Sequence, residues 1–374
     1  MRREWINYFS GIAEDYKSFV IALNKYATQF GYENYFQMVV DFRGMEPSAI
    51  EKFVMSVEER TRNDYQHLLH IAEEDICSLF SISSEEITPD HYSSVFNKMA
   101  MPEEWYKTLN KDSLIQTLDN YFVSGNFSAG DLNEHSDIWY DKDKINQAFF
   151  FCADASTKDF RIYANVKPDT YGLRIMLHEL GHLLHFKYVS DDIPFLLKEP
   201  GNIATEAVAA YFENKIYHSS ALRKMIGINS DPSIPYYDDF NNPSRLFQLR
   251  YLSRNLMFEK SVFENPDQDF TKLWWNLTQK YLRYSAKPKN RLPEWVTNRH
   301  IIYGSMVNAS YLYAYAIAAQ LETYFPDKNM EPLHQFIRYG NAKSWNELLK
   351  TTTGEELNLN YLINSYKKEP LTLK

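Results

Sequence analysis

Residues 176–185 have the sequence MLHELGHLLH, which contains His178, Glu179 and His182 in the pattern His-Glu-x-x-His. In a helix, residues four apart lie one turn apart on the same face. His178 and His182 could therefore bind one zinc ion through two imidazole nitrogens, with Glu179 beside the open coordination position. The pattern predicts a metal-binding catalytic helix.

The other residues of this segment are mostly apolar, which predicts a buried helix. Burying polar groups in such a helix is costly unless they are paired, and a bound metal ion would pair them. Gly181 costs about 1 kcal/mol relative to Ala inside a helix, and it would permit close approach by another backbone or a ligand. A third His ligand would stand at position 188, which is Tyr188, so His185 is interpreted as structural or as a partner of the ligands.

A catalytic zinc with two His ligands usually takes a carboxylate as its third protein ligand. Glu206 lies in ATEAVAAYFENK (204–215), where several Ala residues are small enough to let two helices approach closely. Glu213 follows seven residues later on the same face and could accept a hydrogen bond from a ligating imidazole. As an alternative, Glu206 is a favourable acid in a first helical turn. Other nearby carboxylates are Asp191, Asp192 and Glu199.

Composition and charge limit the class of protein. The 374 residues are 44% hydrophobic and 24% charged, as in soluble globular proteins. A net charge of -9 without a basic stripe argues against a nucleic-acid partner. The sequence contains neither an apolar signal region nor a membrane-spanning stretch, and its two Cys are no disulfide framework. We expect a cytoplasmic protein whose oligomeric state the sequence does not define.

Apolar residues at intervals of three and four predict helices over most of the chain, including 11–40 and 48–80. FFFC (149–152) and FRIYANV (160–166) predict a short β-hairpin directly before the metal helix. The polar segment 229–243 predicts an interruption between helices. The fold class expected is mainly α with this small β element.

We expect one catalytic domain over residues 1–374. Its parts would be a helical N-terminal part (1–110), a catalytic part (111–320) and a helical C-terminal part (321–374).

Four motifs, in order, resemble the angiotensin-converting-enzyme (peptidyl-dipeptidase A) family of zinc peptidases. KDFRI (158–162) precedes HELGH, and Glu206-Ala207 follows at the spacing of the family. LWWNLTQKY (273–281) and RHIIYGSMVNASYLYAYAIAAQ (299–320) resemble two further family segments. The spacing of Glu206 and Glu213 is more similar to related helical carboxypeptidases and oligopeptidases of the same broad fold. The resemblance implies a helical clamshell with a deep central cleft and zinc on its floor.

The resemblance also implies peptidase activity on short unfolded peptides, with one Zn²⁺ per chain held by His178, His182 and Glu206. Glu179 is then the general base that deprotonates the zinc-bound water and passes the proton to the leaving amine.

His300 and Tyr313 match the two supporting donors of the family, with Tyr311 as the second choice for the tyrosine. On a helix, Tyr311 and Tyr315 share a face, while Tyr313 points nearly opposite. The candidate substrate-binding residues are Tyr311, Ala155 and Arg299.

The chain departs from the family where substrates are anchored. The family holds the substrate's C-terminal carboxylate with a Lys and a Tyr, and Asn298 and Ser310 stand at those positions here. A second hypothesis is therefore a catalytically inactive homologue that binds peptides and keeps the metal, although the intact Glu179 argues against it. Two further alternatives are a structural protein with a coincidental motif and another hydrolase chemistry on the same zinc.

Overall fold

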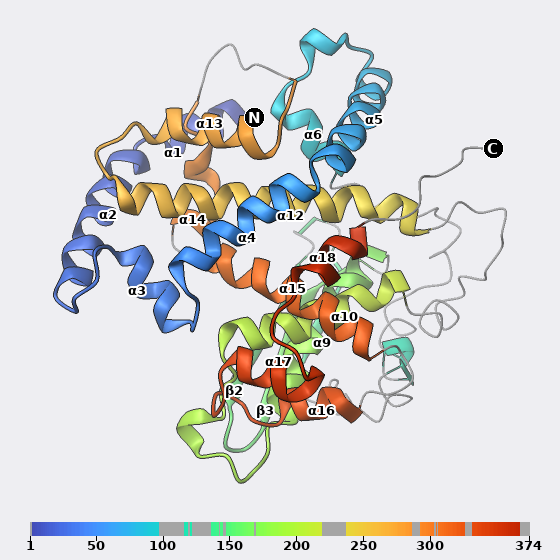
Figure 1. The fold of residues 1–374 in the computed structure, drawn as a ribbon. Coiled ribbons are helices and arrows are strands. Elements are labelled where there is room, and N and C mark those ends of the chain that lie inside the picture. The colour runs from blue at the N-terminus through green and yellow to red at the C-terminus, as the bar shows by residue number, and fades with distance from the viewer. Residues whose placement is uncertain are drawn as a thin grey trace. The chain divides into compact units, whose positions relative to one another are not determined.

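The computed structural model shows a mainly α-helical chain with one three-stranded sheet, which confirms the expected fold class (Figure 1). No helix among the described residues combines the length and the apolar character needed to cross a bilayer. The structure describes residues 2–96, 116–118, 120–121, 136–141, 143–144, 147–167, 170–218, 237–285, 292–302, 304, 306–325 and 331–366.

The chain divides into two compact units, each built from two segments of sequence. The first unit comprises Met1–Lys98 and Pro243–Leu312, and the second comprises Met99–Asn242 and Tyr313–Lys374. The predicted division into N-terminal, catalytic and C-terminal parts stays a prediction, as do the clamshell and its cleft.

The described part of the first unit is helical. Its elements are α1 (Arg2–Phe9), α2 (Ile12–Thr28), α3 (Tyr35–Phe42), α4 (Pro47–Arg60), α5 (Arg62–Phe80), η1 (Ser84–Glu86), α6 (Pro89–Phe96), most of α12 (Tyr237–Glu264), α13 (Phe270–Tyr281), η4 (Glu294–Thr297), α14 (Arg299–Ile302) and the start of α15 (Val307–Tyr324).

The helical segments expected from spacing are divided by local signals. The expected segment 11–40 is two helices, because the side chain of Asn34 accepts a hydrogen bond from the Gln37 amide and begins α3 there. Residues 48–80 form α4 and α5, which are separated at Thr61. The interruption expected through residue 243 is wrong in its last part, because α12 begins at Tyr237.

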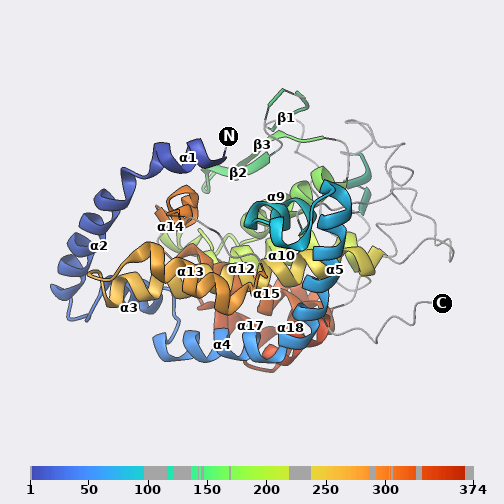
Figure 2. The same cartoon turned by 90° about the horizontal axis from the view of Figure 1, so that it is seen from above.

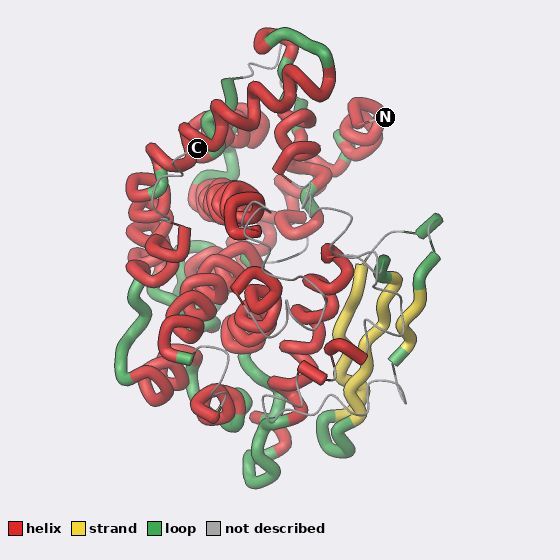
Figure 3. The backbone as a smooth tube through the Cα atoms, turned by 90° about the vertical axis from the view of Figure 1, so that its right-hand side faces the viewer, coloured by secondary structure: helices red, strands yellow, loops and turns green. Residues whose placement is uncertain are grey.

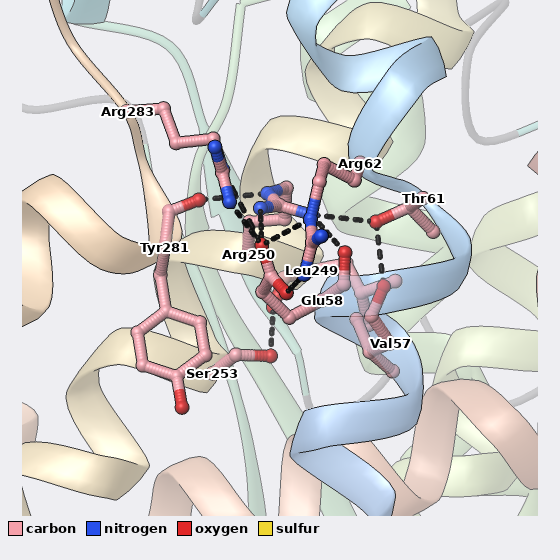
Figure 4. Close-up of polar contacts among 9 residues, drawn as sticks. All are labelled: Val57, Glu58, Thr61, Arg62, Leu249, Arg250, Ser253, Tyr281 and Arg283. Atoms are coloured by element: carbon pink, nitrogen blue, oxygen red, sulfur yellow. Dashed lines mark hydrogen bonds and ion pairs between the residues drawn. The ribbon is translucent and has the colours of Figure 1, made fainter.

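A buried ionic cluster joins α4, α12 and the end of α13 in the first unit (Figure 4). The Glu58 carboxylate, only 5% exposed, accepts hydrogen bonds from Arg62, Arg250 and Arg283. Arg250 is fully buried and also donates to the Tyr281 carbonyl at 2.7 Å. Burial raises the pKa of Glu58, but the hydrogen bonds from Arg62 and Arg283 and the charge of Arg250 outweigh it and bring this pKa to about 2.

A second buried cluster holds the turn that precedes α15. The Glu259 carboxylate accepts hydrogen bonds from the Met306 amide at 3.1 Å and from Asn308 Nδ2 at 2.8 Å. Arg43 donates to the Met306 carbonyl at 2.7 Å. Met306 has a φ of 63°, which a side chain other than Gly rarely adopts. These contacts therefore fix the backbone at the start of the helix that carries Tyr311.

The second unit combines the sheet with further helices. Its elements are β1 (Asp137–Trp139), β2 (Gln147–Asp154), β3 (Asp159–Asn165), α9 (Thr170–Lys187), η3 (Phe195–Leu197), α10 (Asn202–His218), the rest of α15, α16 (Glu331–Ile337), α17 (Trp345–Thr353) and α18 (Leu359–Tyr366).

The predicted hairpin is confirmed as β2 and β3, which pair antiparallel with Phe150 opposite Ile162. β1 pairs parallel with β3 on its other side, so the strand order is β1-β3-β2. Figure 3 shows the strands lying next to one another in yellow. This third strand was not expected from the sequence, because three residues carry too short a pattern. The hairpin packs against α9.

Helices α9 and α10 lie side by side (Figures 1 and 2). The apolar residues of the metal-helix segment are buried, as predicted. They are Met176, Leu177, Leu180, Leu183 and Leu184. The close helix approach expected at Gly181 occurs against the backbone of Ala209 on α10. This contact places the two helices that carry the candidate metal ligands against each other.

Candidate metal centre

Three ligand atoms from α9 and α10 converge in the second unit. Nε2 of His178 lies 3.2 Å from Nε2 of His182. Oε2 of Glu206 lies 3.6 Å from the first of these nitrogens and 3.8 Å from the second. Among the described residues, these three side chains are the one group of His, Cys, Asp or Glu close enough together to bind a common ion.

The triangle fits a zinc ion. Ligands about 2.0–2.1 Å from a tetrahedral zinc are separated from one another by about 3.3 Å, close to the distances found. Oε2 of Glu206 is buried and accepts no hydrogen bond from any described residue. A buried carboxylate oxygen without a donor is costly, and a metal ion would satisfy it.

His178 is oriented by Glu213, as the seven-residue spacing suggested. Its Nδ1 lies 2.9 Å from Oε2 of Glu213. An Nδ1–H donated to this carboxylate leaves Nε2 with its lone pair directed at the cluster. Arg174, which the sequence analysis missed, donates from Nη1 to the other Glu213 oxygen at 2.6 Å.

His182 has a neutral partner. Its Nδ1 lies 2.9 Å from the Thr205 hydroxyl, which precedes Glu206 on α10. Sequence reasoning missed Thr205, because a hydroxyl next to a ligand has no spacing signal of its own. The two imidazoles thus differ in the groups behind them, one a carboxylate and the other a hydroxyl.

Burial and the neighbouring charges shift the pKa values of the cluster in opposite directions. Burial lowers the pKa of His178, but the hydrogen bond and charge of Glu213 dominate and raise it to about 9. Burial raises the pKa of Glu206 to about 7, with the charge of His178 opposing the shift. Burial and the charge of His178 hold the pKa of His182 well below its ordinary value. Without metal, the cluster therefore retains protons that a bound cation would displace.

Glu179 lies beside the cluster and is held by the hairpin. Its Oε2 accepts a hydrogen bond from the Phe150 amide on β2 at 2.6 Å. Burial raises the pKa of this carboxyl, while the charge of His178 and the Phe150 N–H lower it. A carboxyl with a raised pKa and one fixed oxygen suits general acid–base work.

The alternatives left open for the third ligand are disfavoured. Asp191, Asp192 and Glu199 are exposed, and Asp191 pairs with Lys158 at 2.9 Å. The first-turn interpretation of Glu206 is also disfavoured, because α10 begins four residues earlier, at Asn202.

His185 takes no part in the triangle. It is fully buried, and neither ring nitrogen has a hydrogen-bond partner among the described residues. Burial lowers its pKa to about 3, so the ring is neutral. This environment suits a residue packed in the core.

The remaining candidates are divided between the units. His300 and Tyr311 belong to the first unit, and their ring centroids are 5.7 Å apart. Tyr313 belongs to the second unit, is 5% exposed and packs edge-on against Trp345. The helix thus directs Tyr311 and Tyr313 differently, as expected, but it is Tyr311 that contacts His300.

The candidate substrate-binding residues other than Tyr311 lie at or near the surface. Arg299 is exposed on α14, and Ala155 lies in the turn between β2 and β3. Their roles stay predictions.

Comparisons with known proteins show the fold. No family model and no curated protein matches the sequence. Solved structures with a similar fold include PZ peptidase A with an inhibitor, at 15% identity and a TM-score of 0.69 over 95% of this chain and 64% of that one. An oligoendopeptidase F gives 17% identity and a TM-score of 0.66, over 96% of this chain and 64% of that one.

A second oligoendopeptidase F, from Bacillus anthracis str. Ames, gives 15% identity and a TM-score of 0.63 over 94% of this chain. This chain spans 64%, 64% and 61% of the length of the three structures. It therefore shares the helical fold of these peptidases. Kinship with the angiotensin-converting-enzyme family in particular stays an interpretation of the motifs.

Proposed function

We propose that the protein is a zinc-dependent peptidase that hydrolyses short unfolded peptides. The observation that carries the proposal is the triangle of two imidazole nitrogens and a carboxylate oxygen from His178, His182 and Glu206, with Glu179 beside it. When bound, zinc would polarise the scissile carbonyl and make a coordinated water acidic. The shared fold with peptidases supports this chemistry over other zinc hydrolase reactions.

Glu179 is the proposed general base. The Phe150 amide binds its Oε2, so Oε1 is the oxygen available to take a proton from the attacking water. The same carboxyl then gives the proton to the leaving amine nitrogen. From the motif resemblance, the proposed donors to the developing oxyanion are His300 and Tyr313, with Tyr311 as the second choice for the tyrosine.

The test is cleavage of a mixed peptide library by the wild type and by Glu179→Gln, with zinc measured in both. Glu199→Gln, an exposed carboxylate between α9 and α10, is the matched control. We expect about one zinc per chain in all three proteins and turnover in the wild type and the control alone. The positions of the cuts would show whether the enzyme removes residues from an end or cuts internally.

A second candidate is a peptide-binding homologue without turnover. The observation that favours it is the loss of the family's anchoring Lys and Tyr, replaced by Asn298 and Ser310. Zinc in the wild type and in Glu179→Gln, with turnover in neither, would support this candidate. If the wild type, purified without chelators and supplied with zinc, contains no zinc, both the peptidase and the peptide-binding proposals are overturned.

A further inference from the structure

Arg174 lies one helical turn before His178 on the same face of α9. Its Nη1 donates to Oε1 of Glu213 at 2.6 Å, and its guanidinium stands 5.1 Å from the centre of the Tyr171 ring. A carboxylate on one side and an aromatic ring on another hold the guanidinium in a defined place. The Arg174 and Glu213 side chains are only 20% and 11% exposed, so water screens the pair weakly.

This contact determines what Glu213 can do for the metal ligand. One carboxylate oxygen is bound to Arg174, and the other lies 2.9 Å from Nδ1 of His178. With both oxygens engaged, the carboxylate cannot turn away from the imidazole without breaking a charged hydrogen bond. Arg174, Glu213 and His178 therefore form a chain that ends at a candidate ligand atom, Nε2.

Arg174 is also a charged partner for a carboxylate that is largely buried. Removing it would leave Oε1 of Glu213 without this charged donor, and removing one partner of a buried ion pair is costly. The other imidazole gains no such support, because Thr205 behind His182 is neutral.

We infer that Arg174 is a positioning residue for the candidate metal ligand His178: acting through Glu213, it fixes the orientation of that imidazole. The inference rests on the proposed zinc site. It adds a residue that the His-Glu-x-x-His pattern does not contain.

The test is the zinc dissociation constant of Arg174→Met and Arg174→Lys, measured by competition with a chromophoric chelator. Loss of a group that supports a metal ligand typically weakens metal binding by about 10- to 100-fold, which we expect for Arg174→Met. Arg174→Lys keeps the charge and should recover part of this loss. The visible absorption bands of the cobalt-substituted protein should shift in Arg174→Met, because the orientation of one imidazole changes.

Arg161→Met is the matched control, since it breaks another partly exposed Arg–carboxylate pair in the same unit, with Asp159 on β3. It should bind zinc like the wild type. A folded Arg174→Met with unchanged zinc affinity and unchanged cobalt bands would overturn the inference, as would an equal loss in Arg161→Met. If Arg174→Met does not fold, wild-type affinity in Arg174→Lys together with unchanged cobalt bands would overturn it. If the wild type itself binds no zinc, the proposed function is overturned. If the wild type binds zinc and Arg174→Met binds it equally well, only the role of Arg174 is overturned.

Discussion

Gly181 on α9 faces the backbone of Ala209 on α10 so closely that a Cβ added to Gly181 would lie 2.6 Å from the Ala209 Cα. The added atom would also lie 3.0 Å from the Ala209 amide nitrogen. His178 and His182 flank Gly181 on one helix, and Glu206 precedes Ala209 by three residues on the other. The approach of the two backbones therefore controls how close the imidazoles come to the carboxylate.

Gly181→Ala should destabilise the protein and weaken zinc binding. Ala gains about 1 kcal/mol over Gly by helix propensity, but overpacking against a backbone costs about 1–3 kcal/mol and drives the helices apart. Urea unfolding and zinc titration measure the two effects. Gly11→Ala is the control, because a Cβ there meets nothing within 4 Å. Wild-type stability and zinc affinity in Gly181→Ala would show that the helix spacing does not control the site.

His185→Leu should stabilise the protein, most strongly in acid. The pKa of His185 is about 3 in the folded protein and about 6.5 when unfolded, so only the unfolded chain takes up a proton between these values. Stability is therefore lost as pH falls below 6.5, by about 2 kcal/mol at pH 5.

Unfolding of wild type and His185→Leu at pH 7.5 and pH 5 measures this difference. The gap between the two proteins should widen in acid. His67→Leu, at an exposed position on α5, is the control. Its difference in stability from the wild type should be the same at both pH values. An equal difference in stability at both pH values would contradict a buried, neutral His185.

Arg250→Met should destabilise the protein severely. It leaves the buried Glu58 carboxylate with fewer donors, and breaking a buried ion pair from one side costs about 3–5 kcal/mol. Lys17→Met removes a partly exposed partner 3.7 Å from the exposed Asp267 and should cost about 0–1 kcal/mol. Denaturant unfolding at pH 7 compares the two variants, and similar losses would show that the cluster contributes little.

The same cluster makes a prediction about acid. The pKa of Glu58 is about 2 in the folded protein, below the ordinary value of a Glu carboxyl. Its contribution to stability is therefore present above the unfolded pKa and is lost as pH falls toward 2. In Glu58→Gln this acid-dependent loss should be smaller, as unfolding curves between pH 5 and pH 2.5 would show. If the free energy of unfolding changes with pH equally in Glu58→Gln and in the wild type, the lowered pKa of Glu58 is contradicted.

Tyr311→Phe and Tyr313→Phe separate the two candidate donors. If Tyr311 donates to the oxyanion beside His300, Tyr311→Phe should lower kcat by about 100- to 1000-fold with a smaller change in KM. Tyr313→Phe keeps the ring against Trp345 and should change kcat little. A large loss of kcat in Tyr313→Phe with little change in Tyr311→Phe would identify Tyr313 as the donor to the oxyanion.

The sequence alone predicts those parts of the candidate site whose residues are separated by a strict spacing. His178 and His182 follow from helical geometry, and Glu213 from its seven-residue separation from Glu206. The hairpin followed from two β-rich runs close to each other. Gly181 indicated a close backbone approach, because a glycine inside a helix leaves room for another backbone.

Other parts of the site depend on contacts between elements that no local pattern encodes. Thr205 becomes the partner of His182, and Arg174 the partner of Glu213, only when α9 packs on α10. The break at Asn34 is a capping contact within an otherwise helical pattern, and the choice between Tyr311 and Tyr313 depends on which face meets His300. Contacts that have no sequence spacing of their own are thus the ones that the sequence alone cannot assign.

Zinc binding by His178, His182 and Glu206 can be observed in a crystal of the protein grown with zinc, with diffraction data collected on both sides of the zinc absorption edge. We predict one anomalous peak per chain, bonded to Nε2 of His178, Nε2 of His182 and Oε2 of Glu206. A map without a peak among these three atoms, or with zinc held by other residues, would contradict the account.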